Sequence, residues 1–215
     1  MAFVFGRKKL QPHFNILTQA EYAENLEEAL ANPHQYEDRS SGYTLTELGL
    51  WVAERFKDKP VIDLACGSPK SVKRMYRLAS VAGTSDYLGT DILATGRGAY
   101  KSAVEGVKEG MPMENYPRWD VSDKDMLLFL KGLARNLKGN VLFNGIDDAI
   151  IRRDDAGIRY MDEVYLQIKR HLADGGIVIG SGDLHGWLGR FAEHEFERVE
   201  DNGPYRNSIG IFMAK

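Results

Sequence analysis

The feature that most constrains this chain is a short apolar run that leads into a turn of small residues and then into a helix. Residues 61–64 read Val-Ile-Asp-Leu, residues 65–68 are all small, and Pro69 opens a segment with helical periodicity. Proline suits the first turn of a helix, where its missing N–H would have no partner. A turn of small residues lets a ligand approach the backbone, and Gly67 leaves no Cβ in the way. This order predicts a strand, a tight turn and a helix that form the front of a ligand-binding βα unit.

Short β-type runs alternate with amphipathic helices after this unit. Helices are expected at residues 70–81, 99–108, 126–137, 158–172 and, in short form, 187–194. Strands are expected at residues 61–64, 87–92, 118–121, 140–144, 177–179, 196–200 and 208–214. The turn at 201–204 is too short for a parallel crossover, so the last two strands should pair antiparallel. The sequence predicts an α/β fold: a doubly wound, mostly parallel, seven-stranded sheet with helices on both faces and an antiparallel last strand.

Two more helices are expected before the first strand. Residues 19–31 have near-helical apolar spacing with acids between the apolar positions. Thr44 and Glu47 have capping-box spacing at the start of a second helix, which runs to Phe56. We therefore divide the chain into an N-terminal helical segment, 1–43, and an α/β domain, 44–215.

Composition indicates which broad classes of protein this chain can belong to. The 215 residues are enough for one domain, and the single cysteine, Cys66, cannot form an internal disulfide. A net charge of −3 gives no general electrostatic case for binding nucleic acid or an anionic membrane. No apolar run reaches the roughly 18 residues that a membrane span needs. The sequence predicts a soluble cytoplasmic protein without a metal site, and it leaves the oligomeric state open.

Polar residues recur where the predicted parallel strands end, and ligands of doubly wound sheets bind beyond that edge. Asp91 is the most informative, because a carboxylate at the tip of the second strand can accept both ribose hydroxyls of a nucleoside. For any one of these acids, a helix cap or a solvated loop is the simpler explanation. Together they predict a nucleoside site built from the ends at 63–67, 91–92, 120–121 and 144–145.

The central stretch resembles motif I, D-x-G-x-G-x-G, of the class I S-adenosylmethionine-dependent methyltransferases. Here it reads Asp-Leu-Ala-Cys-Gly-Ser-Pro over residues 63–69, and the resemblance continues to the end of the chain. Two motif glycines are replaced: Ala65 costs little if its φ is negative, and Pro69 can serve as the first residue of the helix. The glycines that a dinucleotide-binding G-x-G-x-x-G requires are missing, and so is a P-loop.

The resemblance implies a Rossmann-like fold, S-adenosylmethionine as cofactor and a role for each strand end. Asp63 would orient the amino-acid end of the cofactor through neighbouring backbone or water. Ala65 and Gly67 would line its methionine and ribose, and Asp91 would hold the ribose hydroxyls.

The resemblance also places the adenine and the sulfonium. Ile92 and Val121 would sandwich the adenine, and Asp120 would accept a hydrogen bond from its amino group. Asn144 and Gly145 would lie beneath the sulfonium. The acids that follow Asp120 closely in the sequence are alternatives for this contact with the amino group.

The N-terminal segment and the loops after the fourth and fifth strands hold the remaining candidates. In this family the segment before the domain often folds over the cofactor, so Arg39 or Tyr43 could meet the methionine carboxylate. If the acceptor must lose a proton, Asp147 and His185 are the candidate bases. The chain lacks the Asn/Asp-Pro-Pro-aromatic signature of exocyclic-amine methyltransferases, which argues against adenine or glutamine amides as acceptors. The expected acceptor is a small molecule.

Two other functions stay open at this point. The replaced glycines and the missing signature also fit a methyltransferase-like cofactor-binding domain that has lost catalytic activity and serves a regulatory or interaction role. A nucleic-acid methyltransferase has weaker support, from four basic residues of one helix that more often form a solvated face: Lys70, Lys73, Arg74 and Arg77.

Overall fold

The computed structural model describes residues 37–38, 43–44, 55–92, 94, 97–110, 113–144, 146, 151, 153–181, 186–199 and 209–215. The predicted helix at 19–31 lies outside these ranges, as does most of the one before the first strand, of which Arg55 and Phe56 are helical. From the N-terminal segment, β1 (Glu37–Asp38) and β2 (Tyr43–Thr44) pair antiparallel.

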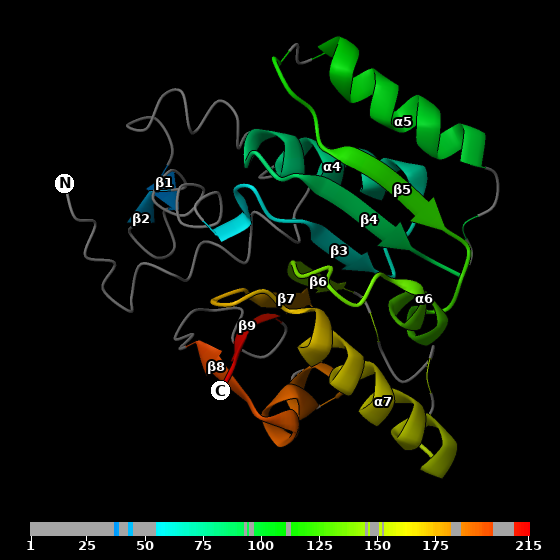
Figure 1. The fold of residues 1–215 in the computed structure, drawn as a ribbon, viewed down its shortest axis with the longest axis vertical. Helices are drawn as coiled ribbons and strands as arrows, with labels where there is room; N and C mark the ends of the chain where they lie inside the picture. The colour runs from blue at the N-terminus through cyan, green and yellow to red at the C-terminus, as the bar shows by residue number, and fades with distance from the viewer. Residues whose placement is uncertain are drawn as a thin grey trace.

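The predicted sheet is confirmed, with seven strands in the order β5-β4-β3-β6-β7-β9-β8. Neighbouring strands from β5 to β7 are parallel, and β9 runs antiparallel to both β7 and β8 (Figure 1). The strands are β3 (Val61–Leu64), β4 (Asp86–Thr90), β5 (Arg118–Ser122), β6 (Asn140–Asn144), β7 (Val178–Ser181), β8 (Phe196–Val199) and β9 (Ile209–Ala214).

Helices cover both faces of the sheet, as predicted. The helices α4 (Pro69–Val81) and α5 (Arg97–Gly110) pack on one face, and α6 (Met126–Gly132) and α7 (Asp155–His171) on the other (Figure 1). A 3₁₀ helix, η2 (Leu188–His194), follows β7. None of the described helices combines the length and the apolar character that crossing a bilayer requires.

The central strand β3 shows why an apolar run was a reliable strand signal here. All four of its residues are buried; Val61 packs in the core beneath α4 and α5, and Ile62 in the core beneath α6 and α7. Successive side chains of a strand point to opposite faces, so a strand covered on both sides is apolar at almost every position. The exception is Asp63, which is buried on the first face.

Helix α6 is shorter than its apolar pattern indicated. Asp125 caps its N-terminus as predicted and accepts hydrogen bonds from the amides of the second and third residues of the helix. The helix was expected to run to residue 137, but it ends at Gly132, and Leu133 is extended with φ −68° and ψ 148°. Glycine is a poor helix former, and the chain must reach the start of β6 within a few residues. Leu133 and Leu137 still pack against the core.

The strand order places the edge where ligands of such sheets bind. β3 pairs with β4 on one side and with β6 on the other, so the chain direction across the sheet reverses at β3. The carboxyl ends of β3, β4, β5 and β6 therefore meet at one edge, next to this reversal. The cofactor residues predicted on these four strands lie within about three positions of the strand ends. The candidates of the N-terminal segment and His185 come from other parts of the chain.

Candidate functional site

The turn after β3 adopts a conformation that the sequence did not indicate. Ala65 has φ +57° and Gly67 has φ +72°, so the negative φ under which Ala65 would cost little is not the one that the turn adopts. A left-handed conformation costs an L-residue roughly 1–2 kcal/mol. The turn is enforced by neighbours: the Cys66 amide donates to the carbonyl of Thr90 at 2.9 Å, which continues the pairing with β4 beyond Leu64.

Gly67 joins three elements at the predicted site. Its amide donates to Oδ2 of Asp91 at 2.9 Å, and its carbonyl accepts a hydrogen bond from the Tyr100 hydroxyl at 3.0 Å. Asp91 directly follows β4, and Tyr100 belongs to α5. Helix α4 then begins at Pro69, as predicted. Hydrogen bonds within the chain thus hold the turn and the strand-end acid together.

Asp63 is close to this turn but is closed off from solvent. Its side chain is 1% exposed, and its Oδ2 accepts a hydrogen bond from the Tyr87 hydroxyl at 2.5 Å. Burial raises the pKa of Asp63 to about 7; the hydrogen bond from Tyr87 opposes this shift, and the negative charge of Asp91 adds to it. A group so enclosed can influence a ligand only through the turn that follows it, which is the indirect role that the resemblance implies.

A pocket of about 420 Å³ opens at this edge of the sheet. Ala65, Asp91 and Ile92 line it, so three of the predicted cofactor residues lie together. The Ile92 side chain is 62% exposed, so this lining residue offers an apolar surface at the pocket. Among the described residues, others that the sequence did not indicate also line it: Thr90, Lys124, Asp125, Met126, Ile146, Ile151 and Tyr160.

Asp125 and Tyr160 form the polar corner of this pocket. Oδ1 of Asp125 accepts hydrogen bonds from the amides of Leu127 and Leu128, at 2.9 and 3.1 Å, and from the Tyr160 hydroxyl at 3.1 Å. Burial raises the pKa of Tyr160 to about 12, so its hydroxyl keeps its proton at neutral pH. One carboxylate therefore caps α6, holds α7 beside it and faces the pocket.

Asp120 and Val121 lie in a neighbouring cavity of about 340 Å³. Asp120 pairs with Arg97 at 3.0 Å, and both side chains are mostly exposed. The walls of the two cavities are connected by a hydrogen bond. The amide of Asp91, which lines the first cavity, donates to the carbonyl of Ser122, which lines the second. The adenine contacts expected of Asp120 and Val121 stay predictions.

The other candidates lie wholly or partly outside the described residues. Arg39, Gly145, Asp147 and His185 are not among them. Tyr43 and Asn144 are described by their backbone, as part of β2 and as the end of β6. Their predicted roles at the methionine carboxylate, the sulfonium and the acceptor stay predictions.

Replacing Ala65 with glycine should raise the free energy of unfolding by about 0.5–1 kcal/mol, because glycine adopts positive φ without steric cost but gains entropy in the unfolded chain. Urea denaturation followed by circular dichroism measures the change. Ala99→Gly is the matched control, at an exposed helical position of α5, and should lower stability by about 1 kcal/mol. Destabilisation by Ala65→Gly would show that the left-handed turn carries no strain.

Comparison with known proteins gives similarity in structure alone. No protein-family model and no curated protein matches the sequence. Among solved structures, SMU.776, assigned as a methyltransferase and solved with SAH, has a TM-score of 0.50 at 10% identity, covering 78% of this chain and 48% of that one. The glycopeptide N-methyltransferase MtfA has a TM-score of 0.48 at 13% identity over 78% and 94% of the two chains. N-methyltransferase NodS from Bradyrhizobium japonicum WM9 has a TM-score of 0.47 at 11% identity over 77% and 92%.

The strand order and the antiparallel β9 agree with the similarity to SMU.776. The chain has the class I methyltransferase fold. It spans about half the length of the SMU.776 chain, so the similarity concerns the fold and not the whole of that protein. In this methyltransferase fold, the 420 Å³ pocket lies at the sheet edge where β3 meets β4 and β6.

Proposed function

We propose that this chain binds S-adenosylmethionine and transfers its methyl group to a small-molecule acceptor. The observation that carries the proposal is the arrangement of Asp91. Its carboxylate follows the second parallel strand, accepts the Gly67 amide and lines a pocket at the reversal of strand order.

The residues of the pocket suit an adenosine-type ligand. The Asp91 carboxylate can accept hydrogen bonds from ribose hydroxyls, and the exposed face of Ile92 offers an apolar surface for a purine. The backbone from Ala65 to Gly67 would lie beside the amino-acid end of the cofactor. A volume of about 420 Å³ lies within the usual range for small-ligand sites.

The chemistry asks little of the protein beyond placement. S-adenosylmethionine supplies an electrophilic methyl group on a sulfonium. The chain must hold the acceptor in line with that group and, for a hydroxyl or ammonium acceptor, remove a proton. Asp147 and His185 are the proposed bases. Ile146 and Ile151 make the wall after β6 apolar, and such a wall keeps water from the reacting atoms.

A second function has a sequence observation in its favour. Ala65 and Pro69 replace motif glycines, which also fits a cofactor-binding domain without catalysis. Ala65 keeps the left-handed conformation that glycine would adopt, and Pro69 opens α4. Both functions therefore include cofactor binding, and turnover separates them.

Thermal unfolding with S-adenosylmethionine and with S-adenosylhomocysteine tests the shared part. At a ligand concentration 100 times Kd, binding should raise the Tm by about 5–10 °C. NAD⁺ is the control, because the turn after β3 lacks the glycines of the G-x-G-x-x-G motif that binds a dinucleotide pyrophosphate. No shift with either sulfur compound would contradict both functions. Binding with no transfer of labelled methyl to a broad panel of small molecules would favour the second.

A further inference from the structure

The wall of the pocket after β6 is held by a residue from a distant part of the chain. Ile151 lines the pocket, and its carbonyl accepts a hydrogen bond from the indole Nε1–H of Trp187 at 2.9 Å. The Trp187 side chain is 1% exposed. A buried indole N–H needs a partner, and here that partner is the backbone of a pocket-lining residue.

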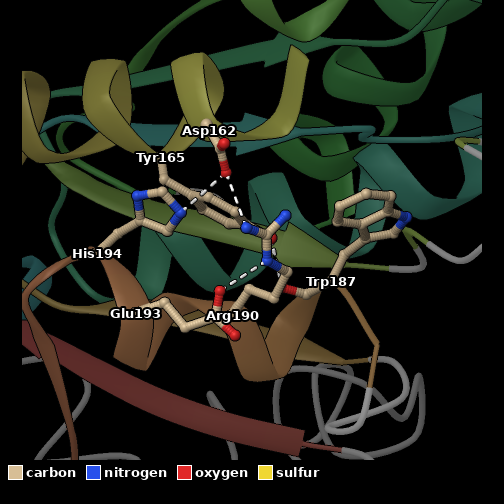
Figure 2. A network of polar contacts seen from close by, with 6 residues as sticks. All are labelled: Asp162, Tyr165, Trp187, Arg190, Glu193 and His194. Atoms are coloured by element: carbon tan, nitrogen blue, oxygen red, sulfur yellow. Dashed lines mark hydrogen bonds and ion pairs between the residues drawn. The ribbon is translucent and has the colours of Figure 1, made fainter. Parts of the chain in front are cut away.

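Trp187 is in turn fixed by its neighbours on α7 and η2. Its own carbonyl accepts a hydrogen bond from the Tyr165 hydroxyl. The guanidinium of Arg190 lies 5.7 Å from the centre of its ring, and Figure 2 shows the two side by side. The guanidinium of Arg153, two residues after Ile151, lies 6.0 Å from the same ring.

Arg190 is held by carboxylates from two elements. Its Nη2 lies 3.0 Å from Oδ1 of Asp162 on α7, and its Nε donates to Oε2 of Glu193 at 2.9 Å. The same oxygen of Asp162 lies 3.1 Å from Nε2 of His194, whose ring is 4.6 Å from that of Tyr165 (Figure 2). Asp162 therefore joins η2 to α7 through two side chains.

We propose that these six residues form a positioning device for the pocket, acting through the carbonyl of Ile151. We name the group Asp162, Tyr165, Trp187, Arg190, Glu193 and His194 the tryptophan clamp. None of the six lines the pocket, so the clamp would not touch the ligand. It sets the position of the wall that the ligand meets, and the identity of that ligand rests on the proposed function.

The exposure of the charged members supports a positioning role over a stabilising one. The side chains of Arg190 and His194 are 24% and 23% exposed, and those of Asp162 and Glu193 are 41% and 62% exposed. Ion pairs at such exposure contribute little to stability. Their role would be geometric, because they orient a guanidinium against the indole of Trp187, which bonds to the pocket wall.

Trp187→Phe tests the clamp, since it removes the N–H and keeps an aromatic ring. In the ligand-free protein, amide hydrogen exchange in residues 146–153 should become at least about fivefold faster, and the Kd for S-adenosylhomocysteine should rise about fivefold. Tyr76→Phe is the matched control. It removes a buried hydroxyl that donates to the carbonyl of Pro117 at 2.8 Å, beneath the helices on the other face of the sheet. It should change neither measurement.

Arg190→Gln is a second test of the clamp, and it leaves the large ring of Trp187 in place. It should speed exchange in residues 146–153 in the same direction while the global free energy of unfolding changes little. The clamp is overturned if Trp187→Phe speeds exchange evenly across the chain, or if it matches Tyr76→Phe in residues 146–153. If the wild-type protein does not bind S-adenosylhomocysteine, the proposed function fails, and exchange in the free protein still decides the clamp.

Discussion

Replacing Asp91 with asparagine should weaken the binding of S-adenosylhomocysteine about 100-fold. Hydrogen bonds to a charged acceptor are each worth about 1.5–3 kcal/mol, and the amide loses the charge for both ribose hydroxyls. Asparagine keeps an oxygen that can accept the Gly67 amide, so the turn should stay in place. Isothermal titration calorimetry of the purified variant and the wild type measures the ratio of the two Kd values.

Asp174→Asn is the control for this titration. Asp174 is an exposed acid in the turn before β7, at the opposite edge of the sheet, so its replacement makes the same change in net charge away from the pocket. Its Kd should stay within about twofold of the wild-type value, because long-range effects of an exposed charge are screened by salt. An Asp91→Asn variant that also binds within about threefold would remove Asp91 from the ribose site.

The titration of Asp63 should lower the free energy of unfolding as the pH rises from about 4 to about 7, and Asp63→Asn should abolish this contribution. Burial raises the pKa of Asp63 in the folded protein to about 7, whereas an aspartate in the unfolded chain has a pKa of about 3.9. Between these values the folded state holds a proton that the unfolded state has lost, so rising pH favours unfolding by up to about 1.4 kcal/mol per pH unit. The stabilisation is complete below the lower pKa and is lost as the pH passes the upper one.

Urea denaturation at a series of pH values measures this effect as a difference between two proteins. Asparagine does not titrate, and its oxygen can still accept the Tyr87 hydroxyl, so the packing around residue 63 should be kept. The variant should gain stability relative to the wild type as the pH rises. The contributions of the other carboxylates are the same in both proteins and cancel in the difference. Two stability curves that run parallel from pH 4 to pH 8 would show that Asp63 titrates normally.

Much of the fold could be predicted from the sequence because the signals are local. A strand buried on both faces is apolar at nearly every position, and β3 has this pattern. The short link before the last strand left antiparallel pairing as the only geometry. The end of α6 was wrong because apolar residues continue beyond Gly132 and pack on the core from an extended segment, which periodicity cannot distinguish from a helix.

The turn after β3 was predicted in position but not in conformation. Rules for glycine state what a positive φ costs other residues, but they do not say which φ residue 65 adopts, so the sequence left the φ of Ala65 open. The hydrogen bonds that hold the turn come from Thr90 and Asp91, which lie on the next strand and its end. Together these hydrogen bonds outweigh the preference of Ala65 for a negative φ. Their partners come together only in the folded chain, so the residues around position 65 do not indicate the outcome.

The sequence alone determined the sheet, the edge at which a ligand would bind and the strand-end pair Asp91 and Ile92, because each depends on residues close together in the chain. The tertiary structure decided which further side chains share that edge. Asp125 and Tyr160 meet through the packing of α6 on α7, and Trp187 reaches the carbonyl of Ile151 across 36 positions of sequence. Such contacts depend on how helices and loops pack against the sheet, and no local periodicity records that packing.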